Sequence, residues 1–410
     1  MKKRTLLLVL LGIIFNSYSQ ERFLQYSSKD SIEGLPKIKG SLGVNLKLNG
    51  YYNIYGGLQE SETFNIGNIN VFETDDAQNF SMDLHQTQIK METTFITKTG
   101  KAIDGMVEFD FWGGNGKMRL RKAYIKTDHF LFGQDWVVFS DSDLWPEILE
   151  WEGPPSGIWV REPLIKYFNN FNNKSWEYTL SLNAPISDYD TFGEFEPLLE
   201  EAYQNTPDFS LAFKHSKKWG HLRMASIIRN IQYKLNSVQD NFVGYGVSFS
   251  GIYKHSTNNV QFQITGGKGV SAYNTTVQGN GFDGFPTING AVDAMPSYGG
   301  WASYELHYSQ KVFSTFVVGY TRFYANDSRR FILTEGAFDS ETVFLGNFDN
   351  SHYYGIVNLM YKPFERMTAG IEMDYGNKKL EFDGYSNDEY LDEMQERNAM
   401  RISFGIMYNF

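Results

Sequence analysis

The last ten residues, 401–410, restrict most strongly what this chain can fold into. Apolar side chains occupy every second position, namely Met400, Ile402, Phe404, Ile406, Tyr408 and Phe410. A period of two, with a terminal aromatic residue and with Arg401 on the opposite side, is typical of a strand in a transmembrane β-barrel. A strand of a soluble β-sandwich can alternate in the same way, so the rest of the chain has to decide between the two.

The N-terminus indicates export. Three basic residues at positions 2–4 precede an apolar run over 6–15, which predicts a signal peptide over 1–19 with cleavage between Ser19 and Gln20. The run is too short to span a bilayer as a helix, and no later stretch approaches about 20 apolar residues. A membrane form of the protein therefore has to be a barrel. The chain has no cysteine, which excludes a disulfide scaffold and a lipid-anchored lipoprotein.

Charge and composition narrow the class further. The formal net charge is −11, and loss of the three basic residues of the signal peptide brings it near −14, which argues against nucleic acid as a partner. Aromatic residues make up 16% of the chain, yet the mean hydropathy is −0.40. Many aromatic residues at low mean hydropathy are expected when half of each strand faces water.

Alternating segments separated by turn residues run through the chain from about residue 44, without a helical period of useful length. We predict an all-β fold, a transmembrane antiparallel β-barrel over 44–410, with residues 20–43 as a short extension in the periplasm or at the barrel mouth. About sixteen strands are expected, and this even number suits a porin-sized barrel with an aqueous interior. The expected strands are 44–58, 79–97, 101–112, 116–127, 129–139, 158–168, 175–184, 207–215, 219–233, 241–255, 257–266, 298–310, 312–324, 352–362, 365–376 and 396–410.

The connections between these segments fall into two classes that alternate along the chain. Short turns, as at 97–100 and 216–220, alternate with long polar loops. The predicted long loops are 59–78, 140–157, 185–206, 267–297, 325–351 and 377–395. Short turns at one end and long loops at the other are typical of outer-membrane barrels, whereas a soluble barrel has no reason to keep its long loops at one end.

Residues 116–168 contain the most informative local pattern. Arg119 and Arg121 share one face of a predicted strand, and because arginine on the lipid face costs several kcal/mol near the bilayer centre, both are expected in the lumen. The following loop, 140–157, is rich in rigid and apolar residues, as a loop that folds back into the barrel would need. Its candidate constriction residues are Trp145, Pro146, Glu147, Glu150, Trp151 and Glu152.

This region resembles the DcaP-like trimeric porins of Gram-negative outer membranes. The matching pieces are the strand Arg-Leu-Arg-Lys-Ala-Tyr at 119–124, the strand Phe-Gly-Gln-Asp-Trp at 132–136, and the loop 146–154 running into Val-Arg-Glu-Pro at 160–163. The resemblance is clear over about 40–170 and implies a sixteen-stranded homotrimeric channel whose third loop narrows the lumen. It also implies uptake of small anions such as dicarboxylates. Some members carry a long helical N-terminal extension, for which residues 20–43 show no heptad pattern.

Six arginines on or near polar faces are candidates for a pore-lining, solute-contacting set: Arg119, Arg121, Arg161, Arg229, Arg322 and Arg401. The alternative is that lumen arginines pair with lumen carboxylates and only hold the barrel in shape. A ladder of positive charge opposite an acidic loop would create a transverse field that favours anionic or dipolar solutes.

Other features give weaker signals. Four tryptophans, at positions 136, 145, 151 and 159, could form an aromatic surface at the constriction, although barrel tryptophans usually belong to interfacial girdles. The acidic clusters 73–76 and 141–143 could bind a divalent cation, but solvated charge is the simpler interpretation. The seven histidines are scattered without metal-ligand spacing, and neither a nucleophile elbow nor a phosphate loop occurs. No metal site, cofactor or catalytic residue is therefore predicted, and an enzyme is not expected.

The expected function is passive diffusion of small hydrophilic, anionic solutes through an arginine-lined lumen. The expected partners are outer-membrane lipid, lipopolysaccharide, the solutes and two further copies in a homotrimer. The alternative is a non-conducting barrel that acts as a binding or adhesion scaffold through its long extracellular loops, of which 267–297 is long enough for that role.

Overall fold

A computed structural model describes residues 24–27, 37–58, 62–72, 76–189, 199–279, 281–289, 291–334, 337–386 and 389–410. The predicted signal peptide 1–19 and its cleavage site lie outside these residues.

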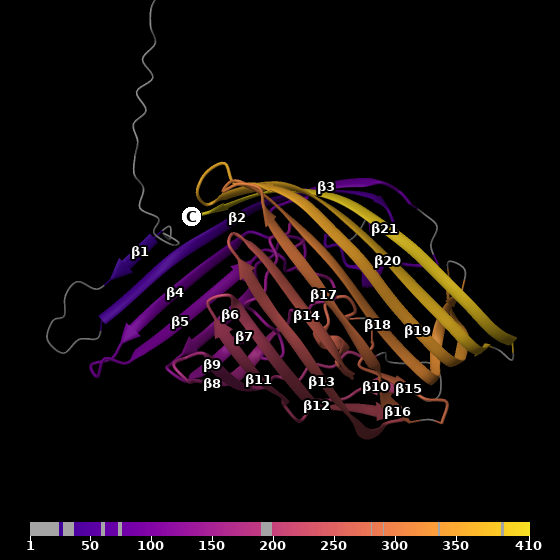
Figure 1. Cartoon of the computed structure of the whole chain (residues 1–410). Helices are drawn as coiled ribbons and strands as arrows, with labels where there is room; N and C mark the ends of the chain where they lie inside the picture. Colours follow the sequence, from indigo (N-terminus) through magenta and orange to yellow (C-terminus); the bar gives the residue numbers. More distant parts are fainter. Residues whose placement is uncertain are drawn as a thin grey trace, which may run out of the picture.

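The described chain forms a closed antiparallel β-barrel of sixteen strands, which confirms the predicted fold class (Figure 1). The wall consists of β2 (Lys37–Tyr55), β4 (Gln88–Ile96), β5 (Ala102–Asp110), β6 (Arg119–Lys126), β7 (Phe130–Trp136), β8 (Arg161–Phe171), β9 (Trp176–Asn183), β11 (Asp208–Lys217), β12 (Gly220–Leu235), β13 (Val238–His255), β14 (Asn258–Lys268), β17 (Pro296–His307), β18 (Val312–Thr334), β19 (Ala337–Tyr361), β20 (Met367–Ser386) and β21 (Glu389–Asn409). The barrel closes where β2 pairs with β4 on one edge and with β21 on the other.

Smaller elements complete the fold. The short strands β1 (Leu24–Ser27) and β3 (Asn79–Asp83) both pair with β2. The short strand β10 (Leu199–Glu201) pairs with β12, and β15 (Gly284–Pro286) forms a separate hairpin with β16 (Val292–Ala294). The two 3₁₀ helices are η1 (Ile66–Asn68) and η2 (Ser271–Tyr273). In the described part of the chain, no helix has the length and apolarity needed to cross a bilayer.

The outer surface of the barrel is an apolar belt with aromatic side chains at two levels. Val247 on β13, Ile264 on β14 and Val318 on β18 are more than half exposed. Tyr245 and Tyr253 point outward eight positions apart on β13, as do Tyr353 and Tyr361 on β19. Eight residues span about 27 Å along the strand, which a tilt of about 40° reduces to about 20 Å of height, comparable with the ~25 Å apolar band of membrane barrels. This outer surface is built to face lipid.

The predicted strand at the C-terminus has the expected orientation. Arg401 and Ser403 are buried on the inner face of β21, whereas Ile406, Tyr408 and Phe410 are exposed on the outer face. The same alternation, polar inward and apolar outward, continues across its neighbours β2 and β20.

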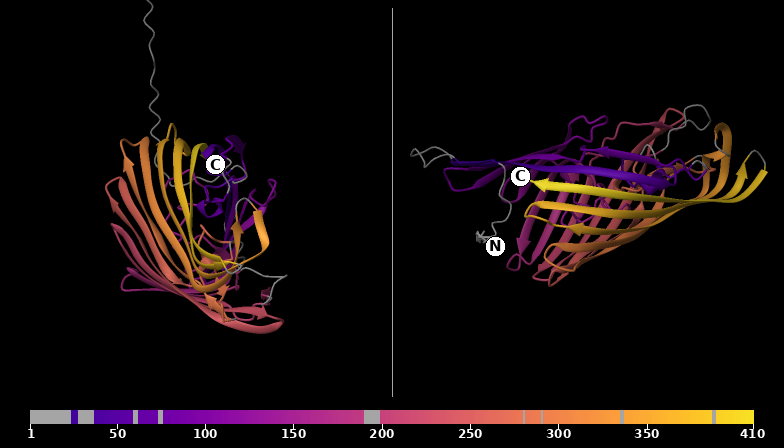
Figure 2. Two further views of the ribbon diagram at one scale, coloured as in Figure 1. Left: turned by 90° about the vertical axis from the view of Figure 1, so that its right-hand side faces the viewer. Right: turned by 90° about the horizontal axis from the view of Figure 1, so that it is seen from above.

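Several predicted boundaries differ from the structure, and the predicted strand 79–97 is divided into β3 and β4. The first wall strand begins at Lys37 rather than at 44, and β1 pairs with its first half, Leu24 opposite Leu42. The predicted loops 325–351 and 377–395 are largely hairpins, because β18 to β21 continue far beyond the apolar belt. Backbone pairing persists there, but without lipid outside the polarity is reversed, as in β20, where Leu380 and Phe382 are buried inward and Glu381 and Asp383 are exposed. Figures 1 and 2 show these long strands projecting beyond the shorter β4 to β9.

Candidate functional site

The connection between β7 and β8, residues 137–160, lies inside the barrel and is bonded to its inner wall. We call it loop 3, and it contains the predicted constriction loop. Its backbone amides at Leu149 and Glu150 donate to the Glu372 carboxylate on β20 at 2.8 and 2.7 Å. Lys47 Nζ on β2 donates to the Leu149 carbonyl at 2.6 Å. Bonds to Gln261 and Gln263 on β14 and to Asn358 on β19 add further anchors. Loop 3 is therefore held from several strands at once.

A hydrophobic core inside the lumen packs loop 3 against one side of the wall. It combines Leu144, Ile148 and Trp159 of loop 3 with residues of loop 1, the connection between β2 and β3 (described over 56–58, 62–72 and 76–78), and with inward side chains of β13, β17, β18, β19 and β21. The other buried members are Leu58, Phe64, Ile66, Ile69, Ile252, Trp301, Val317, Tyr354, Ile356 and Ala399. A second core joins loop 1 to the connection between β14 and β17. Loops from three parts of the sequence therefore fill one side of the lumen.

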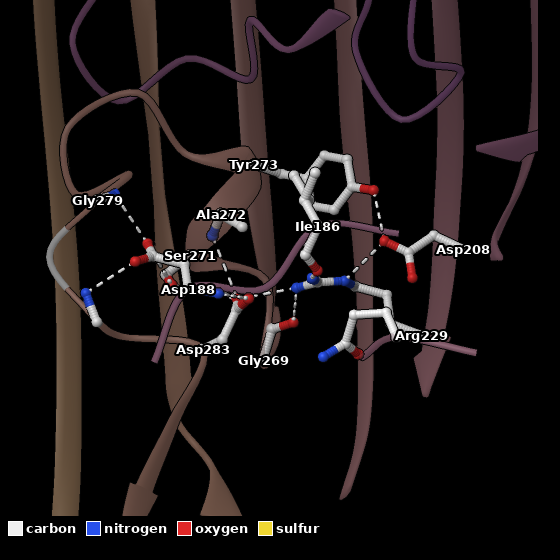
Figure 3. A network of polar contacts seen from close by, with 12 residues as sticks. Ile186, Asp188, Asp208, Arg229, Gly269, Ser271, Ala272, Tyr273, Gly279 and Asp283 are labelled. Atoms are coloured by element: carbon white, nitrogen blue, oxygen red, sulfur yellow. Dashed lines mark hydrogen bonds and ion pairs between the residues drawn. The ribbon is translucent and has the colours of Figure 1, made fainter. Parts of the chain in front are cut away.

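Arg229 on β12 secures the connection between β14 and β17 through a buried ion-pair network (Figure 3). Its guanidinium pairs with Asp208 at 3.0 Å and with Asp283 at 2.8 Å, and it also donates to the carbonyls of Gly269 and Ile186. Asp283 in turn accepts bonds from the backbone of Ala272 and from Ser271.

The Arg229 side chain is 0% exposed. This corrects its prediction as a pore-lining residue: it clamps a loop, and its charge is neutralised by two carboxylates.

Arg119 and Arg121 lie side by side on the inner face of β6 and share a carboxylate. Arg119 binds Asp110 through Nε at 3.0 Å and Nη2 at 2.6 Å, and Arg121 binds Asp110 at 2.9 Å and Glu108 at 2.7 Å. The Arg119 side chain is 35% exposed, whereas that of Arg121 is 8% exposed. Both therefore face the lumen side, and Arg119 is the more accessible of the two.

Arg161, at the start of β8, belongs to the same basic region. Its guanidinium lies 4.7 Å from the centre of the Trp136 ring, and Arg119 and Arg121 are close enough to act on its charge. Among the described side chains no ion-pair partner of Arg161 occurs within 4.0 Å, and its Nη1 is buried without a hydrogen bond. Arg161 is thus the least neutralised of the candidate arginines.

Two other predicted arginines lie away from this region. Arg322 shares its side of β18 with the exposed Val318 and Tyr320, and it pairs with Asp349 and bonds to the outward Tyr298. The structure therefore corrects its prediction as a lumen residue. An arginine is excluded from the outer face only where that face meets lipid. Arg322 follows the outward Tyr320 by two residues, at the edge of the apolar belt, where an outward charge can reach water.

Arg401 faces inward but is only 1% exposed. It donates to Asn53 at 2.7 Å and stacks on Tyr51 at 4.3 Å. Like Arg229, it is a buried structural group in this structure, which corrects its prediction as a solute-contacting residue.

The acidic residues of loop 3 have three different environments. Glu150 is buried and accepts a bond from the Phe64 amide of loop 1 at 2.8 Å, and Glu147 is exposed. Glu152 is half-buried; burial and then repulsion from Glu150 raise its pKa to about 7, although the hydrogen bond with Thr63 and the charge of Arg119 act in the opposite direction. Pro146 is buried, and Trp145 is 41% exposed.

Two cavities lie along β5 and β6, the lower one against β1, β2 and β4 and the upper one between the end of β5 and loop 1. The lower one, about 780 Å³, is lined by inward residues such as Asp104, Met106 and Tyr124. The upper one, about 430 Å³, is lined by Glu62, His85, Trp112 and the turn Gly114–Gly116. Glu108 and Asp110, with their partners Arg121 and Arg119, occupy the positions of β5 and β6 between the two cavities.

Hydrogen bonds and ion pairs account for the described residues of the two acidic clusters predicted from the sequence as possible cation sites. Asp141 accepts bonds from His221 and Ser250, and Asp143 pairs with Lys214. Burial alone would raise the pKa of Asp141, but the bond from His221 and the charge of Arg223 lower it to about 2. Residues 73–75 of the other predicted cluster lie outside the described chain, and Asp76 pairs with Arg397.

The lipid-facing belt, the closed barrel and the infolded third loop define a porin-type outer-membrane barrel. The crystal structure of the outer membrane channel DcaP of Acinetobacter baumannii is similar, with a TM-score of 0.69 and 16% identity over 94% of this chain and 100% of that one. The anion-selective porin from Comamonas acidovorans matches with a TM-score of 0.55 and 9% identity over 91% of this chain and 100% of that one. OmpT of Vibrio cholerae matches with a TM-score of 0.53 and 10% identity over 91% and 98%.

These likenesses confirm the predicted DcaP-like resemblance at the level of the fold. The lipid-facing belt of the closed barrel agrees with the predicted location in the outer membrane. No protein-family model and no curated protein sequence matches the chain.

Sequence reasoning missed several residues of the lumen. Trp112, which lines the upper cavity, and Trp301, which packs on Trp159 at 6.3 Å, were not among the predicted aromatic surface. The position of Trp112 could have identified it, because it follows Asp110 by two residues at the end of a strand whose inner face carries carboxylates. The sequence also indicates which side of the lumen is filled, because the adjacent Ile227 and Ile228 make both faces of β12 apolar.

Proposed function

We propose that this protein is a passive diffusion channel of the outer membrane for small hydrophilic solutes, with a preference for anions. The observation that carries the proposal is the position of the basic cluster. Arg119 and Arg121 lie between the levels of two cavities in a porin-type barrel, next to loop 3, whose Trp151 ring is 4.8 Å from Arg121. A solute that passes from one cavity to the other meets these side chains.

The charge distribution around that level supports an anion preference. Arg119, Arg121, Lys122 and Arg161 cluster on β6 and β8, while Glu108 and Asp110 are their only described carboxylate partners within ion-pair distance. The exposed Glu147 and the half-buried Glu152 belong to loop 3. Positive wall and acidic loop together produce a transverse field that orients dipolar solutes. One structural relative is itself an anion-selective porin.

We further propose the homotrimer as the working assembly and small dicarboxylate-like anions as solutes. The trimer is supported by the porin fold, one relative of which was solved in a trimer form. Lipid and lipopolysaccharide are the surroundings that the apolar belt and the outward Arg322 would meet.

Reversal potentials of the purified protein in planar bilayers under a salt gradient test the proposal. We expect conductance in steps of three with a reversal potential of the sign for anion selectivity. Conductance with cation selectivity would contradict the anion preference assigned to the arginines and would still support a channel.

A non-conducting scaffold is the second candidate, favoured by one specific observation. Loop cores fill much of the lumen, and the hairpins β18–β19 and β20–β21 project far beyond the belt. A folded protein that stays silent in bilayers would support this function instead.

A further inference from the structure

The tryptophans of this barrel are distributed unusually. Membrane barrels concentrate aromatic residues in girdles at the lipid interface. Here two of the eight, Trp176 and Trp219, lie near the short turns, and the other six gather inside around loop 3. These six are Trp112, Trp136, Trp145, Trp151, Trp159 and Trp301.

The inner tryptophans form two groups, and each group carries cations on its ring faces. Trp112 and Trp151 have ring centres 6.3 Å apart, and Arg121 lies 4.8 Å from the Trp151 centre. In the other group, Arg161 and Lys122 lie 4.7 and 5.9 Å from the Trp136 centre. Indole rings therefore hold the basic groups of the proposed anion path in place.

The upper cavity brings one of these rings to the solute. Trp112 lines it together with His85, with Glu62, which pairs with His85 at 3.1 Å, and with the turn Gly114–Gly116, whose two glycines leave room. Its volume of about 430 Å³ is in the range of small-molecule sites.

Arg119 and the backbone of Trp112 share one carboxylate at the edge of this cavity. Asp110 Oδ1 accepts from the Trp112 amide at 3.1 Å and from Arg119 Nε at 3.0 Å. Among the hydrogen bonds of the described residues, Arg119 uses Nε and Nη2, so Nη1 of its partly exposed guanidinium can donate to a further anion.

We propose that the upper cavity is a docking site for small carboxylates with a flat ring, with the ring against Trp112 and the carboxylate toward Arg119. The inference rests on the proposed channel function and names its solute class: aromatic acids pass in preference to aliphatic acids of equal charge. Stacking on one aromatic face is worth about 0.5–1.5 kcal/mol, which is roughly a 2- to 10-fold preference.

Two probes of equal charge and matched carbon skeleton test this, benzoate with a flat ring and cyclohexanecarboxylate with a puckered one. Their permeability ratio is measured from reversal potentials under bi-ionic conditions. In the unaltered channel we expect a benzoate preference of about threefold. Trp112→Leu should bring the ratio near one while the chloride conductance persists, and Trp112→Phe should keep most of the preference.

Trp176→Leu, on the outer surface of β9, is the matched control and should leave the ratio unchanged. An anion-selective channel that passes both probes equally, or a preference that survives Trp112→Leu, overturns the docking site and leaves the channel function intact. A silent or cation-selective barrel overturns the proposed anion channel and this inference with it.

Discussion

The two sides of the lumen are built on opposite principles. Along β12 to β20 the inner wall presents apolar side chains, such as Ile231, Val317 and Phe323, and the loops cover them with a packed core. Along β4 to β6 the inner wall presents Glu108, Asp110 and a row of basic residues, and two cavities lie against it. In the same barrel, one half of the inner surface is the interior of a globular domain and the other half is the wall of a channel.

The difference shows that an arginine's role depends on which side it faces. Arg229, on the covered side, is fully buried between two carboxylates. Arg119, on the open side, shares one carboxylate and keeps a third of its side chain exposed. The same residue type thus clamps a loop in one place and meets the lumen in another.

The largest expected effect comes from breaking the covered side. Arg229→Met would leave Asp208 and Asp283 buried without their cation, which costs about 3–5 kcal/mol when one partner of a buried pair is removed. We expect the connection 269–295 to leave the lumen, with a higher single-channel conductance and new protease cleavage in that segment. Lys268→Met, exposed one residue before it, is the control; unchanged conductance and cleavage in Arg229→Met would show that the clamp is dispensable.

A smaller effect is expected on the open side. Changing Arg119 and Arg121 together to Ser removes two positive charges between the cavities, so the anion-to-cation permeability ratio should fall several-fold. Reversal potentials under a salt gradient measure it. Arg322→Ser, which removes an outward arginine, should leave the ratio unchanged, and equal reversal potentials in the double variant and the unaltered protein would contradict the proposed path.

The smallest expected effect is a dependence on pH. Because the pKa of Glu152 is raised to about 7, this carboxylate is ionised above neutral pH and loses its charge as the pH falls through 7. Loss of a negative charge close to Arg119 should raise the anion preference modestly between pH 8 and 6. Glu152→Gln should hold the preference at its low-pH value throughout, and a variant that keeps the full pH dependence would assign it to another group.

The barrel itself was predictable from the sequence because lipid imposes a strict rule on each spanning strand. Alternation located all sixteen wall strands, with ends that differ mostly by a few residues. Prediction failed where lipid no longer acts. Beyond the apolar belt, β18 to β21 continue as paired strands, and in β20 the alternation is reversed: Leu380 and Phe382 are buried inward, whereas Glu381 is exposed outward. A search for strands with an apolar outer face therefore assigns these residues to loops.

The site was predictable only in part, since pairing across the lumen joins distant segments. Two arginines two positions apart in one strand were enough to place Arg119 and Arg121 inward. The partners of Arg229, by contrast, lie 21 and 54 residues away and come together only through the fold. Arg322 lies an even number of residues from the outward Phe316 and Val318, so the period of two in β18 places it outward. The prediction was wrong because it placed the arginine in the lumen on the basis of its charge alone.

The unequal height of the wall has a consequence for what the cell shows to its surroundings. Strands of 20 to 25 residues form β18 to β21, whereas β4 to β7 have 7 to 9 residues. On the side where long loops reach the exterior, the tall hairpins are the part that an antibody or a bacteriophage touches first. The β20–β21 hairpin stands beside the upper cavity, since Gly57 in the lining of that cavity lies against Arg397 of β21, so recognition from outside and passage of solutes meet at neighbouring parts of the molecule.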